Sequence, residues 1–109
     1  MANAYKVLAQ SAPSAATATD VYTVPGATET VISTVIIANR AATAGTFRLS
    51  VRPNGGTQTN AMYCAYDVPV AANDSTTLTL GLTLDATDVL TLYCSSADMS
   101  VNVFGTEIS

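Results

Sequence analysis

The residues that most often carry out chemistry in proteins are scarce in this sequence. It contains no histidine, so the commonest acid–base catalyst and metal ligand is missing. A serine nucleophile needs an adjacent base, and only carboxylates or Lys6 remain for that role. The six glycines are scattered and form no phosphate-binding loop. The sequence therefore predicts a protein that is not an enzyme and that binds no cofactor.

Aspartates recur where the sequence predicts turns and strand ends. Side chains of this type form turns by hydrogen bonding to nearby backbone amides. An alternative is a calcium site at one end of the fold, for which Asp85 and Asp88 are the candidate pair, although they lack the dense oxygen-ligand spacing of an EF-hand loop. The residues concerned are Asp67, Asp74, Asp85, Asp88 and Asp98.

The two cysteines support two hypotheses. By alternation, Cys64 shares a face with Tyr66 and Cys94 shares one with Leu92, so both thiols are expected to point into the core or an interface. In the first hypothesis they are reduced and act as small hydrophobic residues. In the second, a Cys64–Cys94 disulfide closes a long loop and adds roughly 3–4 kcal/mol of stability in the chain-entropy model.

The segment from Tyr66 to Cys94 best indicates which elements position these residues. Four leucines in it alternate with threonine and glycine, which is the period of a half-buried β-strand. The leucines are expected to face inward and Thr77, Thr79 and Thr83 outward, either as a flat ladder of the ice-binding kind or as a contact surface. A polar turn over residues 85–88 leads to the next strand, residues 89–94.

Other segments show the same alternation. Residues 30–39 are nearly continuous in valine and isoleucine, which predicts a central strand. In residues 46–52 we expect Arg48, Ser50 and Arg52 to face outward. The inward sets are Phe47, Leu49 and Val51, then Met62, Cys64, Tyr66 and Val68, and finally Met99, Val101 and Val103.

Eight short strands at about ten-residue spacing predict an all-β protein, a single antiparallel β-sandwich with jelly-roll or immunoglobulin-like connections. Residues 20–109 would form the sandwich, and residues 1–19 an N-terminal strand followed by an extended arm. That arm is either a disordered tail or a segment, with Tyr5 and Lys6, that docks on a neighbouring subunit.

Composition restricts the partners. Only 11% of the 109 residues are charged, against about 25% in an ordinary soluble domain, which favours a homo-oligomer or another closely packed assembly. The net charge of −4 argues against nucleic acid. No run reaches the roughly eighteen apolar residues of a membrane span, so no membrane partner is expected.

Tyr63 and Tyr93, if exposed, would either stack on sugars or serve as interface aromatics.

Several segments together resemble a family of small β-sandwich structural proteins from tailed bacteriophages. The resemblance covers roughly residues 5–108, and its motifs are strand-and-turn patterns. They are YTVP at 22–25, VISTVIIANR at 31–40, TFRLSVRP at 46–53, YDVPVAANDSTTLTLGLTLDATD at 66–88 and FGTEIS at 104–109. The family tends to carry aliphatic or small residues where this chain has Cys64 and Cys94.

The resemblance implies a non-catalytic virion protein that is made in the bacterial host cytoplasm. The favoured role is a capsid decoration (cement) protein, a homotrimer, that packs on the major capsid protein and stabilises the head. The alternative is a neck, tail or fibre-associated module that binds a host glycan. Arg48 and Arg52 are the expected contacts to an acidic partner surface, with Tyr5, Lys6, Thr77 and Thr79 as further contacts.

Overall fold

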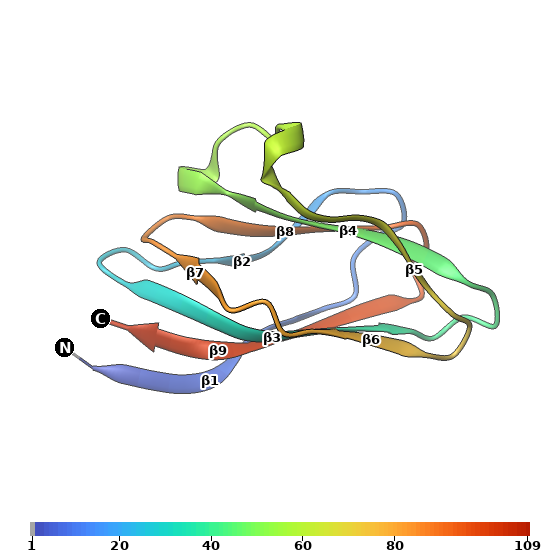
Figure 1. The fold of residues 1–109 in the computed structure, drawn as a ribbon, viewed down its shortest axis with the longest axis horizontal. Coiled ribbons are helices and arrows are strands. Elements are labelled where there is room, and N and C mark those ends of the chain that lie inside the picture. Colours follow the sequence, from blue (N-terminus) through green and yellow to red (C-terminus); the bar gives the residue numbers. More distant parts are fainter. Residues whose placement is uncertain (1) are drawn as a thin grey trace.

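The computed structural model describes residues 2–109, which form two antiparallel β-sheets packed face to face (Figure 1). The predicted β-sandwich is confirmed. The five-stranded sheet has the order β1 (Asn3–Ser11), β9 (Met99–Ile108), β3 (Glu29–Asn39) and β6 (Ser75–Leu78), and β7 (Leu82–Leu84) also pairs with β3. The four-stranded sheet has the order β2 (Thr19–Thr23), β8 (Val89–Cys94), β4 (Gly45–Arg52) and β5 (Tyr63–Val70).

The strand order gives the connections that the sequence left open. β1 pairs with β9, β2 with β8, β3 with β6 and β7, and β4 with β5. The chain is therefore one long antiparallel ribbon that turns back at residues 53–62, where the 3₁₀ turns η1 (Pro53–Gly55) and η2 (Asn60–Met62) stand above the four-stranded sheet (Figure 1). Successive pairs lie in alternate sheets, which is the jelly-roll arrangement. No helix among residues 2–109 is long and apolar enough to cross a membrane.

The core lies between the sheets and comes mainly from the four central strands. The predicted inward residues Phe47 and Leu49 are fully buried, and so are Met99, Val101 and Val103. They meet Ile32, Val35 and Ile37 of β3 and Leu90, Leu92 and Cys94 of β8. The period-two prediction is confirmed for these strands, because their side chains alternate between the apolar core and an outer face.

The leucine-rich strand predicted over residues 77–84 is divided in two. β6 pairs with β3 from Val35 onward and β7 pairs with β3 up to Ile32, so three residues, 79–81, lie opposite two residues of β3. Gly81 adopts a left-handed conformation there (φ 62°) and Leu80 is 45% exposed. The inward assignment was wrong for Leu80 because the extra residue ends the alternation; this division also makes nine strands out of the predicted eight.

Strand β5 also departs from the simple alternation. Leu49 of β4 pairs with Ala65 and Phe47 pairs with Val68, so β5 has one more residue than β4 between the two pairs. Asp67 adopts a left-handed conformation in this bulge (φ 51°). Cys64 and Tyr66 are consequently exposed, and their predicted inward orientation was wrong.

The N-terminal segment is part of the sandwich. β1 pairs with β9 from Asn3 to Ser11, and Ala2 exchanges two backbone hydrogen bonds with Ser109. Residues 12–18 then cross to the other sheet, where the amide of Ala16 donates to the carbonyl of Cys94. The predicted N-terminal strand is therefore present as residues 3–11, and it extends the chain's own five-stranded sheet.

Candidate interaction surfaces

Three tyrosines and one arginine form a stack on the outer face of the four-stranded sheet. Arg48 and Tyr93 are partners across β4 and β8, and the Arg48 guanidinium carbon lies 4.6 Å from the Tyr93 ring centroid. The same carbon lies 4.3 Å from the Tyr66 ring centroid, and Tyr63 packs edge-on against Tyr66 with centroids 4.8 Å apart. We call Tyr93, Arg48, Tyr66 and Tyr63 the tyrosine–arginine ladder.

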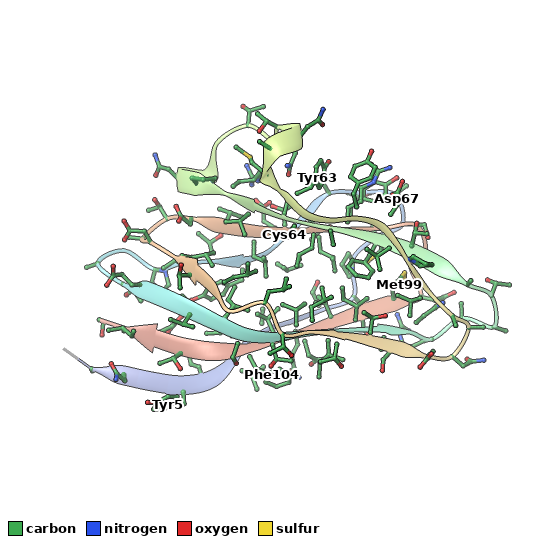
Figure 2. All side chains as sticks on the ribbon, in the orientation of Figure 1. Tyr5, Tyr63, Cys64, Asp67, Met99 and Phe104 are labelled. Carbon is green, nitrogen blue, oxygen red and sulfur yellow. The ribbon has the colours of Figure 1, made fainter. Side chains whose placement is uncertain are left out.

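Asp67 holds the ladder's guanidinium in place. Arg48 Nε donates to Asp67 Oδ1 at 2.7 Å and Nη2 lies 3.4 Å from Oδ2. The bulge in β5 turns both Tyr66 and Asp67 toward Arg48, and Figure 2 shows Tyr63 and Asp67 on the same outer side of the sheet. An ion pair this exposed adds little stability. Its main effect is to fix the position of a cation between two rings, since guanidinium groups stack well on aromatic faces.

Arg52, the second predicted partner contact, is bound within its own chain. Its Nε donates to Thr91 Oγ1 at 3.1 Å, and Nη2 pairs with Asp20 Oδ1 at 2.7 Å. Its Nη1 donates to the carbonyls of Gly55 and Gly56 at 2.9 and 2.8 Å. With its side chain only 17% exposed, Arg52 ties η1 to β8 and β2. The Arg52 guanidinium donates its hydrogen bonds to acceptors of its own chain. The sequence had instead predicted that it would contact a partner protein.

Lys6 belongs to a polar cluster at the open edge between the sheets. Lys6 Nζ pairs with Glu107 Oε1 at 2.6 Å, and the Tyr22 hydroxyl donates to Glu107 Oε2 at 2.6 Å and lies 2.8 Å from Thr30 Oγ1. The hydrogen bond from Lys6, followed by the one from Tyr22, lowers the pKa of Glu107. Burial, followed by the bond to Glu107, raises the pKa of Tyr22 to about 12. The two charges of this cluster, on Lys6 and Glu107, thus neutralise each other on the inner side of the sheet.

The outer face of the five-stranded sheet has a different character. Residues directly opposite each other on paired strands place their side chains on the same face of the sheet. The strand register therefore identifies the residues of this outer face. Rows run across the strands from Tyr5 to Thr106 and Val31, and from Val7 to Phe104 and Thr34. The thirteen central positions, which we call the uncharged face, are Tyr5, Val7, Gln10, Val31, Thr34, Ile36, Ala38, Thr77, Thr83, Ser100, Asn102, Phe104 and Thr106. The register continues this side of the sheet with Ser75 beside Ala38 and, at one end, with a further row of Asn3, Ile108 and the exposed, charged Glu29.

None of these thirteen positions carries a charge. Figure 2 shows Tyr5 and Phe104 pointing away from the other sheet. Tyr5 is 81% exposed and Val7 48% exposed. Of the predicted outward threonines, Thr77 and Thr83 lie on this face, whereas Thr79 lies in the break between β6 and β7. The threonines therefore do not form one continuous ladder.

The aspartates at the end of the sandwich serve the turns, as the turn interpretation predicted. Asp88 accepts hydrogen bonds from the amides of Asn54 (2.8 Å) and Asp85 (2.9 Å), and Asp85 accepts one from the amide of Ala86 (2.8 Å). A hollow of about 410 Å³ lies beside them, bordered also by Glu29, Val31 and Leu84. Within residues 2–109, no three acidic or thiol side chains are grouped as metal ligands.

The two cysteines are free thiols in different surroundings. Cys94 is fully buried in the core beside Phe47, as predicted, while Cys64 is exposed. Their strands, β8 and β5, flank β4 on opposite sides, so their backbones lie about 9–10 Å apart, beyond the roughly 7 Å that a disulfide spans. The disulfide hypothesis was therefore wrong. Burial raises the pKa of the Cys94 thiol to about 11 and also raises that of Cys64.

We expect the two thiols to react at very different rates. With excess disulfide reagent, Cys64 should be modified in the native protein, and Cys94 should react at least about tenfold more slowly because its thiolate forms only when the core opens. Absorbance of the released reagent measures both phases. In Cys64→Ser the fast phase should be absent, and in denaturant both thiols should react at once. A denatured, unreduced chain without reactive thiol would contradict the assignment.

Sequence reasoning identified only part of these surfaces. It placed Arg48 and Tyr93 outward, since both follow the alternation of their strands. It missed Tyr66, because no local signal marks the bulge that turns this side chain outward, and it interpreted Asp67 only as a turn former. It also gave Val7 and Phe104 no role in a surface, because their neighbours on the uncharged face come from strands far apart in the sequence.

Comparison of the chain with protein-family models, with curated proteins and with solved structures found no match. The surfaces described above therefore rest on the chain's own geometry.

Proposed function

We propose that this chain is a non-catalytic structural protein of a tailed-phage particle, specifically a capsid decoration protein that binds across subunits of the major capsid protein. Its sequence resembles small virion β-sandwich proteins, and its fold is a jelly roll, an architecture that includes viral capsid domains and lectins. Fold alone does not choose a function.

The observation that carries the proposal is the tyrosine–arginine ladder. Tyrosine and arginine are enriched among the residues that dominate protein–protein binding energy. Here Asp67 and two rings already order the Arg48 side chain, so less conformational entropy is lost when a partner binds. The ladder also leaves Tyr66 55% exposed at its centre. A preformed aromatic anchor of this kind suits a flat protein surface such as a junction between capsid subunits.

The proposed mechanism is mass action. A ligand that binds only the assembled state stabilises that state in proportion to its occupancy. A decoration protein that contacts two capsid subunits at once would resist their separation, and a specific interface of this kind buries about 1,200–2,000 Å² in total. The ladder would supply its centre, and the neighbouring 53–62 segment part of its rim.

The test is occupancy on particles that lack the protein. We expect Tyr66→Ala and Arg48→Ala to lower binding to such particles at least tenfold, and to remove the gain in particle heat stability that the wild-type chain gives. Thr23→Ala, at an exposed position on the same sheet, is the matched control and should bind normally. Circular dichroism would verify that each variant is folded. Unchanged occupancy of both ladder variants would contradict the proposal.

A second candidate is the neck, tail or fibre-associated module that binds a host glycan, and the exposed ring of Tyr66 favours it. Sugars stack on tyrosine faces, but Arg48 already covers one face each of Tyr66 and Tyr93, which reduces the area left for stacking. Copy number in purified particles separates the two roles. A decoration protein should approach the stoichiometry of the major capsid protein, whereas a tail component should be present in a few to a few dozen copies.

A further inference from the structure

We propose that two copies of this chain pair back to back through their uncharged faces. The inference concerns the isolated protein and does not depend on the proposed role in a particle. Protein interfaces are distinguished from other surfaces chiefly by the depletion of charged residues at their centres, with aromatic residues enriched. The uncharged face has thirteen positions without charge, and Phe104 and Tyr5 among them.

The contrast with the opposite side of the molecule supports the assignment. The outer face of the four-stranded sheet bears two ion pairs, Arg48–Asp67 and Arg52–Asp20. On the five-stranded sheet, Lys6 and Glu107 turn inward and pair with each other, so their charges leave the outer face. One side of the sandwich therefore has charged side chains on its central strands, whereas on the other side the register places a charge, Glu29, only in the row at one end of the uncharged face.

Charge also indicates which partner fits. The chain has a net charge of −4, so two copies repel each other through most orientations. Contact through the uncharged face brings no charged side chains together within its thirteen positions, and Glu29 lies in the row beyond one end of it. Because the same patch would serve both copies, the contact is isologous and closes as a two-fold pair, not as the trimer that the resemblance implies.

The size of the face is sufficient for a stable pair. It spans four strands about 4.8 Å apart, and its longest strands have about ten residues at about 3.3 Å each, giving an outline of roughly 600 Å². A standard interface buries about 800 Å² on each partner, and projecting side chains such as Tyr5 raise the buried area above the outline. Two sheet faces would then pack about 10 Å apart, as in other β-sandwiches.

Sedimentation velocity of the purified chain tests the pairing. We expect a species of twice the monomer mass of 11.2 kDa. Its affinity should not fall as salt is raised, because no ion pair holds the contact and salt screens the repulsion between two copies of net charge −4. Thr34→Lys places a lysine beside Phe104 at the centre of the face and should weaken the pair at least tenfold. Thr77→Lys, at an exposed position of the same face, should act in the same direction if Thr34→Lys proves unstable.

Two controls separate this contact from any other. Thr23→Lys adds the same charge to an exposed strand position on the opposite sheet, and Tyr66→Ala alters the tyrosine–arginine ladder; both should leave the pair intact. A wild-type chain that stays monomeric at high micromolar concentration would overturn the proposal. A trimeric mass, or loss of the pair in Thr23→Lys to the same extent as in Thr34→Lys and Thr77→Lys, would overturn it as well.

Discussion

Gly105→Ala should destabilise the protein by about 3 kcal/mol, a large part of the stability of a small domain. Gly105 of β9 lies opposite Ile32 of β3, next to the irregularity that displaces Ser33. A Cβ atom at this position would overlap the carbonyl oxygen of Val31 and would lie 3.0 Å from Leu8 Cδ1. The obstacle is backbone, so rotation of a side chain cannot relieve it. β3 and β9 would have to separate at the centre of the sheet.

Urea unfolding followed by circular dichroism measures this effect. Gly26→Ala is the matched control, because a Cβ atom at that turn position meets no atom within 4 Å. Its stability should stay within about 0.5 kcal/mol of the wild type. If Gly105→Ala unfolded at the same urea concentration as Gly26→Ala, the close approach of β9 to β3 at this position would be incorrect.

Arg52→Ala should cost about 2–3 kcal/mol, the second largest effect that we expect. The substitution removes four hydrogen bonds and leaves the carbonyls of Gly55 and Gly56 without that donor. Arg52→Lys should recover only part of the loss, because an ammonium group cannot reach the same acceptors as the planar guanidinium fork. Amide hydrogen exchange should show faster opening of residues 53–56 in both variants.

The control for Arg52 is Arg40, an exposed arginine that makes one side-chain hydrogen bond, to the carbonyl of Ala97. Arg40→Ala should change the free energy of unfolding by less than about 1 kcal/mol. Equal effects at the two positions would mean that the Arg52 network contributes nothing beyond an ordinary surface arginine. The comparison also separates loss of positive charge, which both variants share, from loss of the network.

The candidate surfaces show how far local reasoning extends. Arg48 was placed outward correctly, because Phe47 and Leu49 on either side of it are buried in the core. Ser50, also predicted to face solvent, is instead buried, and its hydroxyl donates to Gln58 Oε1 at 2.7 Å. The role of Arg52 was not foreseeable, because its acceptors lie on β2, β8 and η1, which are brought to it only by folding. Tyr66 was misplaced because one extra residue in β5 reverses the orientation of Tyr66 and Cys64. A second register shift, between Leu49 and Ser50, leaves Tyr63 on the outer face opposite Ser50.

The sequence by itself determined the class of the fold and most of its core. Alternation is a local property: a strand with one buried face must place apolar residues at every second position, and Phe47, Leu49, Val101 and Val103 do so. Only the tertiary structure decided the jelly-roll order, the break at residues 79–81 and the separation of Cys64 from Cys94. These depend on which distant strands pair and in which register, and that choice is made by packing energies summed over the whole sandwich.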